Sequence, residues 1–380
     1  MLAIVAPGQG SQTPGMLTPW LTTGERTAAS TAVDRLGWFG AVTGLDLTEL
    51  GTQADEATIR DTAVAQPLLV AAGLLAAAAL ADLLAAELVE SDSRRPAPDR
   101  LPGGLVDLGA ALGADLLAGH SVGELTAATL SGALSAEQAL VLVSRRGAEM
   151  AAAAAARTGG MTAVLGGDPD DVRRRIESHG LVVANSNGGG QVVAAGDPEA
   201  LAAFAADPPP RARLRPLTVA GAFHTAHMAP AVDGLRSLVR GLHARAAEPP
   251  VVSNADGAVV SDGTELLQRI VGQVARPVLW DACQATLAEA GVTGVLELAP
   301  AGTLTGLARR GLPGAATFAL RTPEDLPAAV AFVREHSRSG THSRSGRHSR
   351  SGRQRRDRIG TPAPGPVLDA QIPEAAGGTP

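Results

Sequence analysis

The segment "AGHSVGEL" (118–125) joins an apolar run to a helical pattern, and it decides the fold. The preceding "ADLLAG" (114–119) predicts a short buried strand, and "SVGELTAATLSGAL" (121–134) predicts a helix. Two glycines bracket Ser121, and only residues without a β-carbon let a strand and a helix pack so closely around a turn. Strand, GxSxG and helix in this order are typical of a nucleophile elbow, although a glycine-bracketed helix cap is the alternative.

Apolar strand patterns alternate with helical patterns along most of the chain, which predicts an α/β fold with a parallel sheet. "LAIVAP" (2–7) and "GVLELAP" (294–300) are further buried strands of this kind. Residues 161–220 differ, because strands and helices follow in the order β-α-β-β-α-β within about sixty residues. This order predicts a small inserted ferredoxin-like domain.

We therefore predict three parts of the chain. The catalytic domain is discontinuous and comprises residues 1–158 and 226–335, and the ferredoxin-like subdomain comprises residues 159–225. Residues 336–380 contain near-repeats of HSRSG and few apolar residues, so we expect a disordered low-complexity tail rather than a basic arm that binds acidic surfaces. The proline- and glycine-rich segment 90–104 predicts a surface loop.

Local signals mark the starts of several helices. Ser135 is followed three residues later by Gln138, which predicts a capping box. Asp168 precedes Pro169, a pair that predicts an N-cap followed by the first helical residue.

The apolar region 55–90 is predicted to form helices in the core. The pair Gln66–Pro67 predicts a junction between two helices, because proline disfavours a helix interior. The run "LLVAAGLLAAAAL" (68–80) is too short to span a membrane, so we expect a buried helix here.

The composition narrows the possible functions. The chain has 380 residues, of which 45% are hydrophobic, and a formal net charge of −6, which predicts a globular protein with no nucleic-acid partner. Its one cysteine, Cys283, excludes an intramolecular disulfide and argues against a cysteine-based metal site. The N-terminus "MLAIVAPGQG" lacks a basic leader, so we expect a cytoplasmic protein that does not associate with a membrane.

A nucleophilic serine needs a base, and five histidines precede the predicted tail. His179 and His243 lie at predicted helix ends among charged residues, and the ring of His120 would face away from the serine. His224, in "VAGAFHTAHM" (219–228), follows an apolar strand and is flanked by small residues. We expect His224 to be the base, and a buried structural histidine is the alternative.

Six motifs occur in an order that resembles one known family, the malonyl-CoA:acyl-carrier-protein transacylases. They also resemble the acyltransferase domains of polyketide and fatty-acid synthases. The resemblance covers residues 1 to 335, and the six motifs together are far more specific than any one of them. They are "PGQGSQ" (7–12), "GHSVGE" (119–124), "RRGAEM" (145–150), "NSNGGGQVVAAG" (185–196), "GAFHTAHM" (221–228) and "VGQVARPVLW" (271–280).

The resemblance implies an α/β-hydrolase-like large domain and assigns catalytic roles to individual residues. Ser121 matches the nucleophile and His224 the base. The main-chain N–H groups of Gln9 and Val122 match the oxyanion hole, and the main-chain carbonyl of Gln273 matches the group that orients the imidazole. No metal or bound cofactor is implied.

The resemblance also implies how the substrate is held. Arg146 matches the residue that pairs with the malonyl carboxylate, because a guanidinium fork fits a carboxylate bidentately, and Arg145 is the alternative if the register shifts by one. Phe223 matches a pocket wall that would crowd a branched acyl group, as in malonyl-selective members. Gln66 and Asn187 match further polar positions near the pocket.

The implied function is transfer of a malonyl group from malonyl-CoA to the phosphopantetheine thiol of acyl carrier protein, by a monomer, through an acyl-enzyme. One alternative is an acyltransferase of a single polyketide pathway that uses another extender unit. A second alternative is a serine hydrolase or thioesterase, although in that fold the histidine usually comes late in the chain. A third is a non-catalytic scaffold that functions through the tail.

Overall fold

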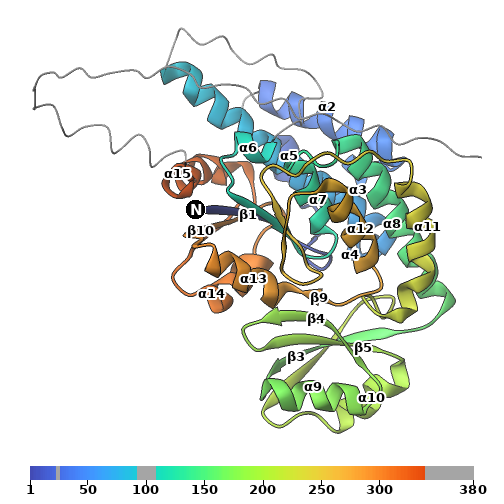
Figure 1. Ribbon diagram of the computed structural model, residues 1–380. Helices are drawn as coiled ribbons and strands as arrows, with labels where there is room; N and C mark the ends of the chain where they lie inside the picture. The colour runs from blue at the N-terminus through green and yellow to red at the C-terminus, as the bar shows by residue number, and fades with distance from the viewer. Residues whose placement is uncertain (23–25, 92–107, 339–380) are drawn as a thin grey trace, which may run out of the picture.

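Six strands form the larger of two sheets, in the order β11-β10-β1-β2-β7-β8 (Figure 1). Neighbouring strands from β11 to β7 are parallel, and only the edge pair β7–β8 is antiparallel. The computed structural model describes residues 1–22, 26–91 and 108–338. The strands of this sheet are β1 (Leu2–Ala6), β2 (Leu116–Gly119), β7 (Val251–Val252), β8 (Val259–Val260), β10 (Gly294–Glu297) and β11 (Ala316–Ala319).

Helices cover both faces of the larger sheet, which is why its strands are apolar on both sides. Leu2 and Ile4 of β1 pack into the core shared with α5 and α8, whereas Ala3 and Val5 pack on the opposite face with residues of α13 and α14. The helices are α1 (Thr18–Thr22), α2 (Arg26–Thr43), α3 (Leu47–Thr52), α4 (Glu56–Arg60), α5 (Thr62–Ser91), α6 (Leu108–Ala111), α7 (Gly123–Leu130), α8 (Ala136–Ala156), α9 (Pro169–Ser178), α10 (Pro198–Ala206), α11 (Ala229–Val239), α12 (Gly263–Gln273), α13 (Trp280–Glu289), α14 (Thr303–Gly311) and α15 (Leu326–His336).

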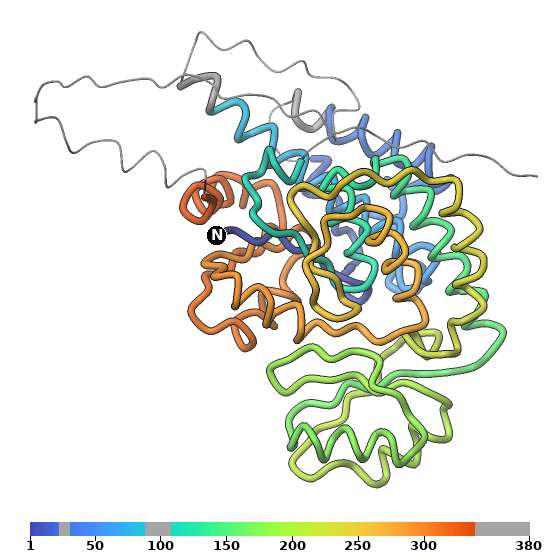
Figure 2. Tube along the Cα trace, in the orientation of Figure 1, coloured from blue at the N-terminus to red at the C-terminus, as the bar shows by residue number. Residues whose placement is uncertain are grey.

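The smaller sheet has the strand order β6-β3-β5-β4-β9 and lies beside the larger part (Figure 1). Figure 2 follows the chain from α8 into this sheet and back to α11. The predicted succession β-α-β-β-α-β is observed, with α9 and α10 as its helices. The strands are β3 (Gly160–Gly166), β4 (Val182–Gly188), β5 (Gln191–Gly196), β6 (Ala212–Leu217) and β9 (Val278–Leu279).

The sequence pattern did not indicate strand β9. Val278 and Leu279 pair with Asn185 and Ser186 of β4, so α13 begins only at Trp280. This parallel pairing ties the small sheet to the segment that follows α12. Two residues carry too little periodicity for a sequence pattern to reveal such a strand.

The capping signals are confirmed. Ser135 Oγ accepts the main-chain N–H of Gln138 at 3.2 Å, and Gln138 Oε1 accepts that of Ser135 at 2.9 Å. The Asp168 carboxylate accepts the N–H groups of Asp170 and Asp171, both at 3.1 Å. Both predicted helix starts therefore lie where the local hydrogen bonds place them.

The predicted junction at Gln66–Pro67 is wrong, because α5 runs without interruption from Thr62 to Ser91. The junction lies at Asp61, whose carboxylate accepts the Ala63 N–H at 2.8 Å and so caps the helix there. Burial against neighbouring helices stabilises α5 despite the proline in its second turn.

Helix α5 is also longer than the apolar run that predicted it. Thr62–Glu87, with a mean hydropathy of 2.3, passes the length and composition test for a membrane-crossing helix, and it is the one such helix among the described residues. However, 72% of its apolar window is buried inside the protein. Burial, rather than short length, therefore supports the prediction of a core helix.

Most of the predicted surface loop 90–104 and of the predicted tail 336–380 lies outside the described residues. At the tail boundary, α15 includes His336, one residue past the predicted end of the folded part. The His336 ring packs on Phe332 with ring centroids 4.4 Å apart, and its Nδ1 lies 3.0 Å from Thr293 Oγ1.

Candidate active site

A strained turn places Ser121 between β2 and α7. Ser121 has a φ of 53°, in the left-handed region that disfavours residues with a side chain. A β-carbon on Gly119 would overlap the main chain of Gly123, and one on Gly123 would overlap the main-chain oxygen of Ala6. The two glycines therefore allow β1, β2 and the start of α7 to meet. The helix is shorter than predicted and begins two residues after the serine.

Ser121 and His224 meet although 103 residues separate them in the chain. Ser121 Oγ lies 2.8 Å from His224 Nε2, and His224 Nδ1 lies 2.9 Å from the main-chain oxygen of Gln273. Because a carbonyl only accepts, Nδ1 carries the proton and Nε2 is left to accept from the serine. In this arrangement Nε2 of His224 can accept the hydroxyl proton of Ser121.

His224 lies in an environment that keeps its imidazole neutral. Burial and, to a smaller extent, the nearby Arg146 guanidinium lower the pKa of His224 to about 3. The hydrogen bond to Gln273 opposes this shift. Like Ser121, His224 has a left-handed backbone, with a φ of 62°, which no sequence pattern indicated.

Arg146 reaches the same site from α8. Its side chain is buried with only 1% of the residue exposed, and its Nη1 donates to Gln66 Oε1 at 2.6 Å. Its Nη2 donates to Gln273 Oε1 at 3.1 Å and to Ser121 Oγ at 3.3 Å. Burial lowers the pKa of Arg146 to about 10, so the guanidinium stays charged at neutral pH.

The neighbouring Arg145 points elsewhere. Its side chain is 56% exposed and pairs with Glu149 at 2.5 Å, one turn further along α8. The arginine that lies beside Ser121 is therefore Arg146, and its role toward the malonyl carboxylate stays a prediction.

Ser121 and His224 line a pocket of about 260 Å³, and Arg146 is not among its lining residues. The remaining residues that were predicted near the substrate line it as well, namely Gln9, Gln66, Val122, Asn187 and Phe223. A β-carbon on Gly8 would lie 2.7 Å from the main-chain oxygen of His120, so the loop that carries Gln9 packs directly on the serine turn. Asn187 Oδ1 lies 2.9 Å from His120 Nε2 across the pocket.

Comparison with known proteins identifies the family. A family model described as an acyl transferase domain matches residues 107–327, more than half of the chain. The malonyl CoA-acyl carrier protein transacylase of Mycobacterium tuberculosis is 44% identical over 328 residues, which covers 86% of this chain and 98% of that protein. The chain belongs to the malonyl-CoA–acyl carrier protein transacylase family. The Escherichia coli enzyme of the same name is 31% identical over 336 residues, which covers 86% of this chain and 98% of the relative.

Solved structures of the transacylase family agree with the observed α/β fold. The Mycobacterium tuberculosis structure superimposes with a TM-score of 0.75 at 42% identity, and covers 87% of this chain and 99% of its own. A malonyl-transacylase in complex with a type II polyketide synthase acyl-carrier protein superimposes with a TM-score of 0.71 at 29% identity, with coverages of 87% and 99%.

Sequence reasoning missed Asn254, a site residue of this transacylase-family chain that follows β7. Its Oδ1 accepts the main-chain N–H of Ser121 at 2.8 Å, and its Nδ2 donates to the main-chain oxygen of Gly119 at 2.8 Å. One buried carboxamide thus holds both sides of the strained turn. The only signal in the sequence was a polar pair, Ser253 and Asn254, after a short apolar strand.

Two further polar groups surround Asn254. The Glu124 carboxylate accepts the Asn254 main-chain N–H at 2.6 Å, and the Gln273 side chain donates to Asn254 Oδ1 at 3.0 Å. Burial raises the pKa of Glu124 to about 8, while the Asn254 hydrogen bond and the Arg146 guanidinium act against the shift. Within the described ranges, no three His, Cys, Asp or Glu side chains gather as they would around a metal ion.

Proposed function

We propose that this chain transfers the malonyl group from malonyl-CoA to the phosphopantetheine thiol of an acyl carrier protein, through an acyl-enzyme on Ser121. The observation that carries the proposal is the position of Arg146, whose buried guanidinium lies 3.3 Å from the hydroxyl that is hydrogen-bonded to His224. A nucleophile beside a buried cation suits an acyl group that itself carries a carboxylate.

The proposed reaction has two halves. His224 Nε2 accepts the Ser121 proton while Oγ attacks the thioester carbonyl, and the main-chain N–H groups of Gln9 and Val122 stabilise the oxyanion. The C–S bond breaks, and the CoA sulfur leaves with the proton from the imidazolium. The carrier-protein thiol then attacks the serine ester, gives its proton to His224, and Ser121 Oγ regains that proton.

A serine hydrolase is less well supported as an alternative. The histidine of a serine hydrolase is usually oriented by a carboxylate, whereas Nδ1 of His224 contacts the main-chain oxygen of Gln273. A polyketide pathway remains a second candidate for the carrier partner, because the similar malonyl-transacylase named above is bound to a type II polyketide synthase acyl-carrier protein.

Intact-mass spectrometry tests the proposed function. Mixing the protein with malonyl-CoA should add one malonyl group to the chain, and adding a holo acyl carrier protein should move that group to the carrier. Acetyl-CoA and methylmalonyl-CoA serve as competing donors. A protein that forms no malonyl adduct, or that releases malonate to water rather than to the carrier, would contradict the proposal.

We further propose that residues 1–158 and 226–335 form an α/β-hydrolase-like domain and residues 159–225 a ferredoxin-like subdomain. The parallel order of the larger sheet and the order β6-β3-β5-β4 of the smaller one support this division. A monomer without metal or bound cofactor suffices for the mechanism, because Ser121, His224 and Arg146 come from one chain. A cytoplasmic location suits CoA thioester and carrier-protein substrates.

Activity should persist at a pH where an ordinary histidine would already be protonated. Because the His224 pKa is lowered to about 3, its base form stays populated, and we expect kcat/KM for acetyl-CoA, which has no carboxylate to bind, to hold its value down to about pH 5. The lowered pKa also affects the free energy of unfolding. Below pH 6.5 this histidine takes up a proton in the unfolded chain but not in the folded one, so the stability that is present above pH 6.5 is lost as the pH falls toward 3. Single-turnover acylation by acetyl-CoA between pH 5 and pH 8 provides the check, and an acid limb centred near pH 6.5 would contradict the activity prediction.

Phe223 should control branching of the acyl group. Its side chain lines the pocket beside His224, and replacing it with serine would open space for one more methyl group. We expect Phe223→Ser to raise the methylmalonyl-to-malonyl ratio of kcat/KM by on the order of tenfold or more while malonyl transfer continues. Competition between the two thioesters measures this ratio directly. An unchanged ratio would mean that Phe223 packs in the core without touching the acyl group.

A further inference from the structure

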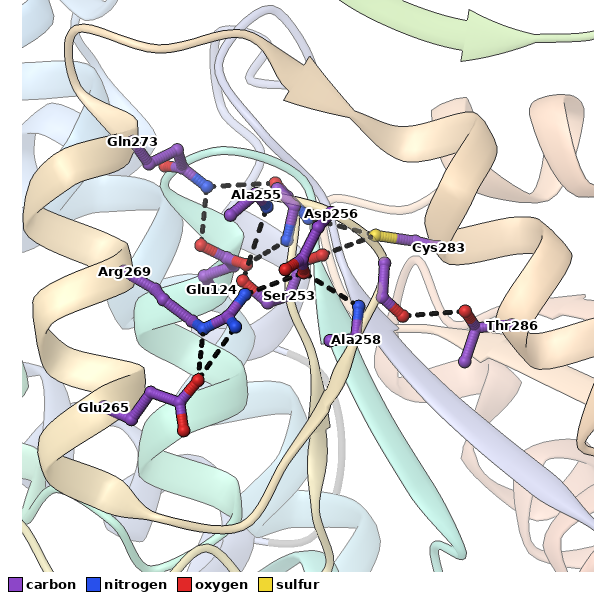
Figure 3. Close-up of polar contacts among 12 residues, drawn as sticks. Glu124, Ser253, Ala255, Asp256, Ala258, Glu265, Arg269, Gln273, Cys283 and Thr286 are labelled. Atoms are coloured by element: carbon purple, nitrogen blue, oxygen red, sulfur yellow. Dashed lines mark hydrogen bonds and ion pairs between the residues drawn. The ribbon is translucent and has the colours of Figure 1, made fainter.

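Glu124 is a buried carboxyl group that the proposed mechanism does not use. It lies in α7, three residues after Ser121, and only 1% of the residue is exposed. Its Oε1 accepts the main-chain N–H of Asn254 at 2.6 Å, and its Oε2 accepts from Gln273 Nε2 at 2.5 Å. Figure 3 shows the Gln273 side chain directed at that of Glu124, beside the segment that follows β7. Both of these partners are donors, and the Ser253 side chain is a third hydrogen-bond partner of the carboxylate.

These contacts determine which way the Gln273 carboxamide faces. Its nitrogen donates to Glu124 and to Asn254 Oδ1, so its oxygen is turned the other way. That oxygen accepts from Arg146 Nη2 at 3.1 Å. A chain of hydrogen bonds therefore runs from Glu124 through Gln273 to the guanidinium beside Ser121.

We propose that Glu124 is a positioning residue for acyl-group selection, which holds the Gln273 carboxamide so that its oxygen aims the Arg146 guanidinium at the acyl site. The inference rests on the proposed function, because it concerns the carboxylate of the transferred group. Gln66 accepts from the other terminal nitrogen of Arg146, Nη1, and Nε contacts no acceptor among the described residues. The orientation of the guanidinium therefore depends on the Gln273 oxygen that accepts from Nη2.

A carboxylate is required at this position because no arrangement of amides satisfies the same contacts. In Glu124→Gln, the new amide nitrogen faces either the Asn254 main-chain N–H or Gln273 Nε2, and both are donors. If the Gln273 carboxamide turns over to relieve this, its oxygen faces Asn254 Oδ1 and its nitrogen faces Arg146. Arg146 then loses an acceptor.

The test compares malonyl-CoA with acetyl-CoA, which lacks the carboxylate. The ratio of the two kcat/KM values does not depend on how much protein is folded. We expect Glu124→Gln to lower this ratio roughly ten- to hundredfold, mainly through KM for malonyl-CoA, while acetyl transfer stays within about threefold. Because burial raises the Glu124 pKa to about 8, the assays are run at about pH 8.5, where the carboxylate predominates.

A matched control is Glu265→Gln. Glu265 belongs to the same cluster in Figure 3, but its carboxylate is half-exposed and pairs with Arg269 at 2.8 Å rather than with Gln273. We expect this variant to keep the wild-type ratio. The direction in which the malonyl-to-acetyl ratio changes in Glu124→Gln distinguishes a positioning role from a purely electrostatic one. Loss of a negative charge alone would strengthen the positive field of Arg146 and raise malonyl transfer, whereas loss of positioning lowers it.

Two further variants complete the test. Glu124→Asp keeps the charge but shortens the reach to Gln273, so it should also lower the malonyl-to-acetyl ratio of kcat/KM. It serves as the test if Glu124→Gln does not fold. In a double-mutant cycle, adding Gln273→Met to Glu124→Gln should cause little further loss of the malonyl-to-acetyl ratio. Both substitutions interrupt the same chain of hydrogen bonds from Glu124 through Gln273 to Arg146.

An unchanged or raised ratio in the Glu124 variants, or losses that multiply in the double variant, would overturn the inference. A wild-type protein that forms no malonyl adduct would instead refute the proposed function.

Discussion

Ser121→Ala should form no malonyl adduct and should lose transfer activity by roughly 10⁴- to 10⁶-fold in kcat. The reason is that Ser121 Oγ is the hydroxyl hydrogen-bonded to the neutral His224, at 2.8 Å, and no chemistry in the proposed reaction proceeds without that oxygen. The expected loss is large because the serine and the histidine act as one unit. Intact-mass spectrometry after mixing with malonyl-CoA measures the adduct, and transfer to holo carrier protein measures the rate.

The serine substitution has a suitable control within the chain. Ser144→Ala removes a hydroxyl from α8 that donates to the Leu140 main-chain oxygen at 2.9 Å, outside the pocket. This variant should acylate like the wild type. A malonyl adduct that persists in Ser121→Ala would place the acyl group on another residue and remove the assignment.

Arg146→Ala should lose malonyl transfer while acetyl transfer is retained or increased. The malonyl carboxylate must leave water to enter the pocket, and an unpaired buried carboxylate is costly. Truncating one partner of a buried pair typically costs ~3–5 kcal/mol. This corresponds to a fall of roughly a hundred- to several-thousand-fold in kcat/KM for malonyl-CoA. Acetyl-CoA has no carboxylate to leave unpaired, so its transfer does not require the guanidinium.

Arg145→Ala is the matched control for the clamp. Arg145 is adjacent in sequence and carries the same charge, but its side chain is 56% exposed and pairs with Glu149. It should change neither malonyl nor acetyl transfer by more than about twofold. If Arg146→Ala slowed malonyl and acetyl transfer equally, Arg146 would have a structural role and the clamp assignment would be wrong.

Features that depend on neighbours in sequence were predictable. The strand before Ser121, the capping box at Ser135 and the N-cap at Asp168 each follow from residues within a few positions of one another. Even the order of strands and helices over β3 to β6 follows from local periodicity. The family resemblance added residues that the structure places in the pocket or in contact with Ser121 and His224, although their catalytic roles stay predictions.

Features that depend on burial were less predictable. Pro67 read as a helix boundary, but it lies inside α5, because packing against the core outweighs the cost of a proline in the second turn. Strand β9 is only two residues long, and it exists because β4 offers it a partner.

The sequence by itself determined the serine turn, the α/β pattern and the family, because glycine spacing and hydrophobic periodicity are local properties of the chain. Only the tertiary structure decided the arrangement of the polar groups around that turn. Asn254 contacts Ser121 across 133 residues of chain, and Gln273 contacts Glu124 across 149. A buried donor is stable only when it is hydrogen-bonded to an acceptor, and the fold determines which acceptor lies next to it. The pattern of residues along the chain does not predict that partner when it is distant in sequence.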